Sequence, residues 1–394
     1  MDPTSPSPGP AEVTPLPVPA APEPADAPVT ASGTLADTLA DTLADTVTGT
    51  LAADPERWTH DHRPSIRSRA ISRALYLGLR PFIHRVPGHA LSLRAARSTV
   101  DAASVFLRAG QRARVLPLID PRVETGADAP PVIGEWVVSR ASVHADSVRG
   151  LLPNGAILYL HGGGYVVCSP RTHRSITSRL AVETGLPVLA PHYRMAPEHP
   201  FPAPLEDAVA AYRWLLDRGV PASGIVLAGD SAGGHLAASL TGEIMRTGLP
   251  TPAGTVLFSP WVDLTCELST QEQLVARDPY ISAHAARRVA RVVVGHGGFD
   301  DPRLALLTSP WRDAPPFLVQ VGGAEVLRPE AEAFAEALTR ADVDCELQVW
   351  TGQMHVFQLL NRVLPEASAA MSEAARFIAR VTASDPAVPE SAVA

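Results

Sequence analysis

Short apolar runs that alternate with longer helical stretches constrain the fold of this chain more than any other feature. The run Ala156–Leu160 is almost continuously apolar, which is typical of a parallel strand buried on both faces. Strands are expected at 136–138, 156–160, 186–190, 225–228, 255–258, 317–321 and 345–350, and helices at 174–184, 204–218, 232–247, 329–341 and 366–381. This alternation predicts an α/β fold with a doubly wound, mostly parallel sheet.

The segments that flank the alternating region differ from it in composition. The N-terminal segment is rich in Pro, Ala, Thr and Asp and has too little apolar surface to offset the entropy of ordering it, although a weak amphipathic helix is the alternative. The next segment is rich in Arg and carries apolar residues at helical spacing. We therefore expect a disordered tail, a helical cap segment, a catalytic α/β domain and a loose C-terminal tail, at 1–55, 56–125, 126–382 and 383–394.

Charge and composition exclude several classes of function. The net charge of −8 gives no reason to expect nucleic-acid binding. No apolar run reaches the roughly 18–20 residues that a membrane-spanning helix needs. The three cysteines are widely spaced and the N-terminus does not have the pattern of a secretory signal, so a cytoplasmic location is expected. The Arg-rich helices would face solvent, or alternatively a membrane surface or a partner. The oligomeric state stays open, a homodimer included.

A serine flanked by glycines stands where one expected strand passes into the next helix. Ser231 follows Gly229 by two residues and precedes Gly233 by two. A nucleophilic serine projects from such a sharp turn, where small neighbours let strand and helix approach each other. The start of the helix also directs N–H groups toward developing negative charge. Ser231 is therefore the expected nucleophile.

Three consecutive glycines follow the expected strand at 156–160. Their bare backbone N–H groups can approach a carbonyl oxygen closely and stabilise an oxyanion. We expect the N–H groups of Gly163 and Gly164 to serve as donors, with that of Ala232 as the third. A phosphate-binding loop is the alternative, but neither GxxxxGK[ST] nor GxGxxG accompanies these glycines. His161, which precedes them, is expected to anchor the loop rather than to act as a base.

Two residues that follow later strands are the expected acid and base. Glu325 comes after the strand at 317–321, and His355 comes after the strand at 345–350. Ligand sites in open α/β sheets lie at these strand ends. His355 can take the serine proton and pass it to a leaving group, while Glu325 orients the ring. Other acidic residues downstream of Ser231 are alternatives for the acid, namely Asp300, Glu330, Asp342 and Asp344.

Taken together, these motifs resemble the hormone-sensitive-lipase-like branch of the α/β-hydrolases. The resemblance spans about residues 130–380 and rests on HGGGY at 161–165, YRMAPEHPFP at 193–202, GDSAGG at 229–234, SPWVDL at 259–264 and HxF at 355–357. The family acid is usually Asp in a GxxDxL-like stretch, where this chain has Glu325. Within the motifs, Tyr165 and Tyr193 are expected to contact the substrate. Glu198 resembles a structural position near the glycine loop.

The resemblance implies an α/β-hydrolase fold with an N-terminal helical cap over the active site. It also implies a serine carboxylic-ester hydrolase that cleaves short- to medium-chain acyl esters through an acyl-enzyme, with a small-molecule ester as its partner and no metal or organic cofactor. Cleavage of lactones, amides or thioesters by the same triad is an alternative. A non-catalytic ligand-binding member of the fold is another, but the intact HxF setting of His355 favours an enzyme.

Overall fold

The structure of the chain is a computed structural model that describes residues 59–60, 63–81, 90–104, 110–120, 130–142, 148–275 and 278–383. The expected N-terminal tail and nearly all of the expected C-terminal tail lie outside these residues. The statements below concern the described part of the chain.

Nine strands form one sheet in the order β1-β9-β8-β7-β6-β4-β5-β3-β2 among the described residues. β3 runs antiparallel to both of its neighbours, β2 and β5, and the other pairs are parallel. In chain order the strands are β1 (Thr59–His60), β2 (Ala113–Asp120), β3 (Val132–Ser139), β4 (Ala156–Leu160), β5 (Val188–Pro191), β6 (Ile225–Asp230), β7 (Gly254–Phe258), β8 (Phe317–Gly322) and β9 (Cys345–Trp350). The expected mostly parallel α/β sheet is confirmed.

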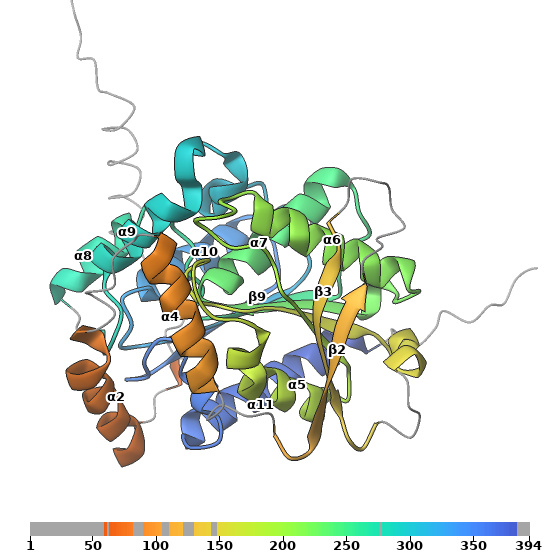
Figure 1. Cartoon of the computed structure of the whole chain (residues 1–394), viewed down its shortest axis with the longest axis horizontal. Coiled ribbons are helices and arrows are strands. Elements are labelled where there is room, and N and C mark those ends of the chain that lie inside the picture. The colour runs from red at the N-terminus through yellow and green to blue at the C-terminus, as the bar shows by residue number, and fades with distance from the viewer. Residues whose placement is uncertain are drawn as a thin grey trace, which may run out of the picture. The chain divides into compact units, whose positions relative to one another are not determined.

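Helices cover both faces of this sheet (Figure 1). In Figure 1, α5 (Arg174–Thr184) and α11 (Pro365–Thr382) lie below it, and α6 (Ala203–Asp217) and α7 (Ala232–Thr247) lie above it. Side chains of the central strands alternate between two apolar cores. In β6, Leu227 packs in the core that includes α6, α7 and α10 (Arg328–Arg340), whereas Val226 and Ala228 pack in the core with α5 and α11. Burial on both faces accounts for the nearly continuous apolar runs of these strands.

The segment 56–125 is only partly helical. It contains α2 (Ile66–Gly78) and α4 (Ala90–Ala103), as expected, but Ala113–Asp120 forms strand β2 and pairs with β3 along its whole length. The sheet therefore begins before residue 126, the boundary expected from the sequence. Arg114, Pro117 and Ile119 of β2 are exposed, so this edge strand does not have the continuous apolar run that marked the central strands. The helices α8 (Glu267–Val275) and α9 (Ala283–Val294) were also not anticipated.

Candidate active site

The candidate nucleophile lies in a strained turn between β6 and α7. The backbone of Ser231 has φ 53° and ψ −122°. Residues other than glycine rarely adopt a positive φ of this size. The turn holds β6 and α7 so close together that a Cβ on Gly229 would lie 2.2 Å from the carbonyl oxygen of Gly233. The backbone amide of Ser231 donates to Phe258 O of β7 at 2.9 Å. The glycine spacing thus reflects a physical limit on the approach of two elements.

The structure brings Ser231, His355 and Glu325 into one hydrogen-bonded chain. His355 Nε2 lies 2.9 Å from Ser231 Oγ, and His355 Nδ1 lies 2.6 Å from Glu325 Oε2. Ser231 is partly exposed, whereas Glu325 is completely buried. The arrangement therefore presents a serine to solvent with a histidine behind it and a carboxylate behind the histidine, which is the order that serine hydrolases require.

The charges around the three hydrogen-bonded side chains make the His355 imidazole more basic. Burial by itself would lower the pKa of His355, but the hydrogen bond to Glu325 and the negative charge of that carboxylate raise the pKa above its ordinary value. The buried carboxylates of Asp278 and Asp230 act in the same direction. His355 is thereby a better proton acceptor than a free imidazole, as a general base should be.

The carboxylate of Glu325 is held by groups other than His355. Its Oε1 atom accepts a hydrogen bond from Ser259 Oγ at 2.8 Å and another from the backbone amide of Gly322. Ser259 Oγ in turn accepts from the amide of Val356 at 3.0 Å, so one hydroxyl ties the acid to the loop that carries His355. Sequence reasoning placed Ser259 in a family motif but gave it no role.

Of the alternative acids, Glu330 has the most complete set of partners, and none of them belongs to the candidate triad. Its carboxyl group accepts from Ser269 Oγ and from the amide of Asp263, the latter at 3.0 Å. Burial raises the pKa of Glu330 well above its ordinary value. The Glu330 carboxyl group therefore links α10 to the chain around α8. Glu325, in contrast, is the carboxylate that contacts His355.

The glycine loop is tied to the strand that precedes Ser231. Asp230 Oδ1 accepts from the Tyr159 hydroxyl at 2.6 Å and from the amide of Gly162 at 3.0 Å, while its Oδ2 lies 3.1 Å from His173 Nε2. His161 stacks on Tyr193 with ring centroids 4.3 Å apart, and burial lowers the pKa of His161 to about 3. A neutral, stacked imidazole supports the loop, in line with the anchoring role expected of it.

Two backbone amides of the glycine loop have no hydrogen-bond acceptor among the described residues. Gly163 has φ 111°, and a Cβ there would lie 2.2 Å from Val167 O, so only glycine fits. Gly163 and Gly164 are partly exposed, and their N–H groups donate to no acceptor within the described residues. Ala232 is the first residue of α7, where a helix N–H has no intrahelical partner. These are the three amides expected to serve as donors.

The two tyrosines expected to bind substrate lie beneath the loop. Tyr165 is fully buried and its hydroxyl lies 2.7 Å from His235 Nδ1. Tyr193 is 4% exposed and donates to His161 O at 2.6 Å. Because both phenol groups are satisfied inside the protein, the structure assigns them to support of the loop and lends no weight to direct substrate contact.

Comparison with known proteins places this geometry in a family. A family model described as an alpha/beta hydrolase fold matches residues 157–359, more than half of the chain. The chain belongs to the α/β-hydrolase fold family. This result confirms the fold expected from the motifs.

Relatives within the family agree with the resemblance to hormone-sensitive lipase. A crystal structure of an esterase from the bacterial hormone-sensitive lipase family aligns with a TM-score of 0.69 and 32% identity, over 82% of this chain and 100% of that chain. An acetyl-hydrolase of Streptomyces hygroscopicus is 40% identical over 251 residues, which cover 62% of this chain and 83% of the relative. Esterase LipU of Mycobacterium tuberculosis is 32% identical over 278 residues, or 69% of this chain and 92% of that protein.

In this α/β-hydrolase, α4 is fastened to the chain segments around the glycine loop. Arg97 Nε donates to Val166 O at 2.7 Å, and its Nη2 donates to Glu198 Oε2 at 2.8 Å and to Ala196 O. Burial would raise the pKa of Glu198, but hydrogen bonds from Arg94 and Arg97 lower it to about 2. Glu198 thus has the structural position expected of it, as the residue through which α4 is held.

Loss of the Arg97 contacts is expected to destabilise the fold. We expect Arg97→Gln to lower the free energy of unfolding by about 1.5–3 kcal/mol, because hydrogen bonds to a charged group are lost from a partly buried position. Urea unfolding followed by circular dichroism measures the change. Arg246→Gln is the matched control, since Arg246 is largely exposed and pairs only with Glu243, three residues away. The control should change stability by at most about 0.5 kcal/mol. Equal effects of the two substitutions would contradict the role of Arg97.

A second segment that sequence reasoning missed holds the His355 loop from the other side. The Tyr280 hydroxyl donates to His355 O. Asp278 Oδ2 accepts from the amide of Val326, the residue after Glu325, at 3.0 Å. The segment between α8 and α9 therefore contacts the base of the candidate triad and the residue that follows the acid. Its contacts run mainly through backbone atoms, which have no sequence signature.

Two further features of the described residues concern metal ions and membranes. They contain no group of three or more His, Cys, Asp or Glu side chains placed to hold a metal ion. A bilayer-spanning helix is likewise absent from them, since none of their helices combines sufficient length with sufficient apolar character.

Proposed function

We propose that this α/β-hydrolase is a serine carboxylic-ester hydrolase that works through an acyl-enzyme. The observation that carries the proposal is the continuous chain Ser231 Oγ, His355 and Glu325, with contacts of 2.9 and 2.6 Å. The relatives named above are esterases and an acetyl-hydrolase, which supports hydrolysis of ester bonds. They also support an enzyme over a ligand-binding member of the fold that lacks catalysis.

In the first half of the reaction Ser231 becomes acylated. Ser231 Oγ attacks the ester carbonyl carbon while His355 Nε2 takes the hydroxyl proton. The carbonyl oxygen becomes an oxyanion that accepts hydrogen bonds from the amides of Gly163, Gly164 and Ala232. The intermediate collapses when the C–O bond to the alcohol breaks, and His355 gives its proton to the departing oxygen.

The second half of the reaction regenerates the serine. A water molecule attacks the acyl carbon while His355 takes one of its protons, and a second oxyanion forms at the same amides. Collapse releases the carboxylic acid and returns the proton from His355 to Ser231 Oγ. Glu325 keeps Nδ1 of His355 protonated throughout, so Nε2 is free to accept and return each proton.

We further propose a preference for short- to medium-chain acyl groups. The support is the name of the Streptomyces hygroscopicus relative, an acetyl-hydrolase. A series of p-nitrophenyl esters from acetyl to palmitoyl, assayed with the full chain, tests both proposals. The highest kcat/KM should fall among the short and medium chains and should decline toward palmitate. A maximum at palmitate would contradict the chain-length preference, and no turnover of any ester would contradict the esterase itself.

A further inference from the structure

Asp278 is a buried carboxylate that the reaction described above does not use. It is 3% exposed and lies shortly after α8. Its Oδ1 atom accepts hydrogen bonds from the backbone amides of Tyr280 at 2.8 Å and Ile281 at 2.7 Å, and its Oδ2 atom accepts from the amide of Val326 at 3.0 Å. Within the described ranges no side chain donates to this carboxylate. Because burial of a charge without an ion-pair partner is costly, a functional reason for the charge is expected.

The two oxygens of Asp278 hold different parts of the chain. The Oδ1 contacts close a turn within the segment between α8 and α9, which an asparagine could also do. The Oδ2 contact reaches 48 positions along the chain to the residue after Glu325. The turn also places Tyr280, whose hydroxyl donates to His355 O. One short segment therefore contacts the backbone next to the acid and the backbone of the base.

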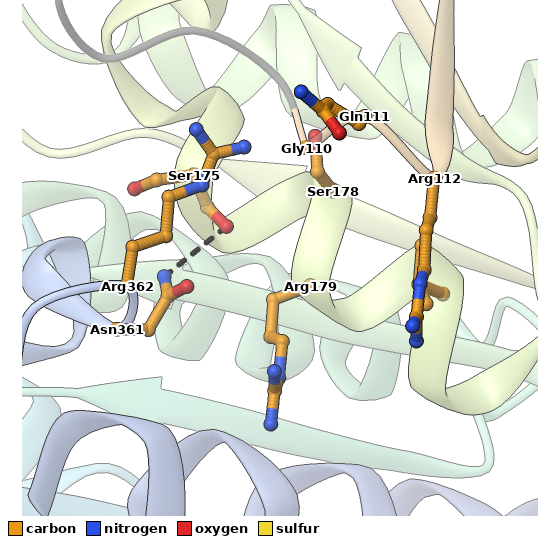
Figure 2. A pocket seen from close by; sticks show the side chains of 9 residues that line it. Gly110, Gln111, Arg112, Ser175, Ser178, Arg179, Asn361 and Arg362 are labelled. Carbon is orange, nitrogen blue, oxygen red and sulfur yellow. Dashed lines mark hydrogen bonds between the residues drawn. The ribbon is translucent and has the colours of Figure 1, made fainter. Parts of the chain in front are cut away.

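The loop that carries His355 is anchored farther along the chain by α5 (Figure 2). Ser175 Oγ donates to Leu359 O at 2.9 Å, and Asn361 Nδ2 donates to Ser175 O at 3.1 Å, the bond drawn in Figure 2. These contacts hold the chain beyond His355, whereas Tyr280 contacts His355 itself. The α5 contacts therefore fix the far end of the loop, and the Tyr280 contact fixes the end next to the imidazole.

The charge of Asp278 also acts on His355. Burial by itself lowers the pKa of His355, and the contact with Glu325 raises it. The carboxylates of Asp278 and Asp230 raise the pKa of His355 further. The Tyr280 ring, whose centroid lies 5.9 Å from that of His355, adds no charge, because burial raises the pKa of its phenol well above the ordinary value. Asp278 therefore stabilises the imidazolium that forms when His355 takes the serine proton.

We propose that Asp278 is a positioning residue of the triad, which holds Glu325 through the amide of Val326 and His355 through Tyr280. The inference rests on the proposed serine-hydrolase function. Loss of either tie would free one backbone to move and would lengthen the 2.6 Å contact between Glu325 and His355. A small displacement of this kind slows a reaction that needs exact alignment of the base.

Tyr280→Phe removes only the hydroxyl that donates to His355 O. We expect kcat for p-nitrophenyl acetate to fall about tenfold with KM unchanged within about twofold, because the base is displaced while the substrate site is intact. Tyr212→Phe is the matched control, since the Tyr212 hydroxyl also donates to a backbone carbonyl, that of Pro250, and contacts no triad residue. It should keep kcat within about twofold.

Asp278→Asn keeps the size of the side chain but replaces one acceptor oxygen by an NH₂ group and removes the charge. The remaining oxygen can still close the turn, so the contact with Val326 is the one expected to be lost. We expect kcat to fall about tenfold to hundredfold at unchanged KM. Asp263→Asn is the matched control, because both Asp263 oxygens accept backbone amides, those of Thr265 and Glu267. It should keep kcat within about twofold.

The pKa of His355 gives a readout that needs no turnover and that a merely structural role would not move. NMR titration of the chain labelled with ¹⁵N-histidine measures this pKa, and the resonance is assigned by its loss in His355→Gln. The pKa should fall in Asp278→Asn and in Tyr280→Phe, because the contact with Glu325 weakens, and should stay unchanged in both control variants. The acidic limb of the kcat/KM profile should move to lower pH in the same two variants.

Thermal unfolding shows which variants are folded, and the titrations then decide the proposal. An unchanged pKa of His355 in both Asp278→Asn and Tyr280→Phe would overturn the positioning role, even if kcat fell. Unchanged kcat in both variants of a chain that hydrolyses esters would overturn it as well. If the unmodified chain hydrolysed no ester but the pKa of His355 fell as expected, the esterase would be contradicted and the positioning of His355 supported.

Discussion

Ser231→Ala is expected to lower kcat for p-nitrophenyl acetate by about 10⁶-fold, which is the scale on which serine hydrolases lose activity with their nucleophile. Alanine has no atom that can form the acyl-enzyme, and His355 Nε2 loses the hydroxyl that lies 2.9 Å away. A small rate above that of water should survive, because the proposed oxyanion donors, the amides of Gly163 and Gly164, are unchanged in this variant.

Stopped-flow or long-time-course absorbance measurements can follow the residual rate, and thermal unfolding shows that the variant is folded. Ser309→Ala is a matched control, because the Ser309 hydroxyl donates locally to Ala305 O and lies outside the candidate site. It should leave kcat unchanged within about twofold. If Ser231→Ala kept a tenth or more of the original rate, another residue would have to be the nucleophile.

The position of Ser231 could be predicted because its neighbours are constrained by sterics rather than by long-range contacts. No Cβ fits at Gly229, where it would lie 2.2 Å from the carbonyl oxygen of Gly233, so the spacing of the motif follows from local geometry. Glu325 and His355 could be predicted for a related reason. They follow the adjacent parallel strands β8 and β9, whose carboxyl ends meet at one edge of the sheet.

Residues that act across long sequence separations could not be predicted in the same way. Ser259 lies 97 positions from Val356 and 66 from Glu325, and its bonds to both depend on how β7 and β9 are placed in the sheet. Tyr165 stands in the HGGGY motif beside the expected oxyanion donors, which suggested substrate contact. Its ring instead turns inward to His235 of α7, and that rotation depends on tertiary packing.

The edge of the sheet shows a different limit of sequence reasoning. β2 pairs with one neighbour, and exposed residues interrupt it at three positions, so it has neither the continuous apolar run nor the helical spacing used to assign elements. Arg112, which precedes this strand, was accordingly placed in a helical segment.

Glu325→Gln is expected to lower kcat by about 10⁴-fold while leaving the fold intact. The amide is nearly isosteric with the carboxylate and can still accept from Ser259 and Gly322, so Glu325 Oε1 contacts can be kept. It carries no charge to stabilise the imidazolium that forms when His355 takes the serine proton. Its NH₂ group can also favour the tautomer of His355 that carries its proton on Nε2, which cannot act as the base.

The pH dependence gives this prediction a second, independent readout. Only neutral His355 acts as a base, so kcat/KM of the unmodified enzyme should fall as the pH decreases through the raised pKa of His355, above the ordinary value of 6.5. In Glu325→Gln the hydrogen bond and charge that raise this pKa are lost while burial, which lowers it, remains. The acidic limb should therefore move to lower pH, and the activity ratio between the two proteins should be smallest in acid.

Glu330→Gln separates this effect from the general loss of a buried carboxyl group. Glu330 is completely buried like Glu325, and burial raises its pKa well above its ordinary value, so glutamine replaces a second buried carboxyl group of the same size. Its contacts are with Ser269 and Asp263, and we expect kcat to change by less than about threefold with no shift of the acidic limb. A purely structural role of Glu325 would change the free energy of unfolding but would not shift the acidic limb of the kcat/KM profile. If Glu325→Gln left that acidic limb unshifted, the Glu325 carboxylate would not act on His355.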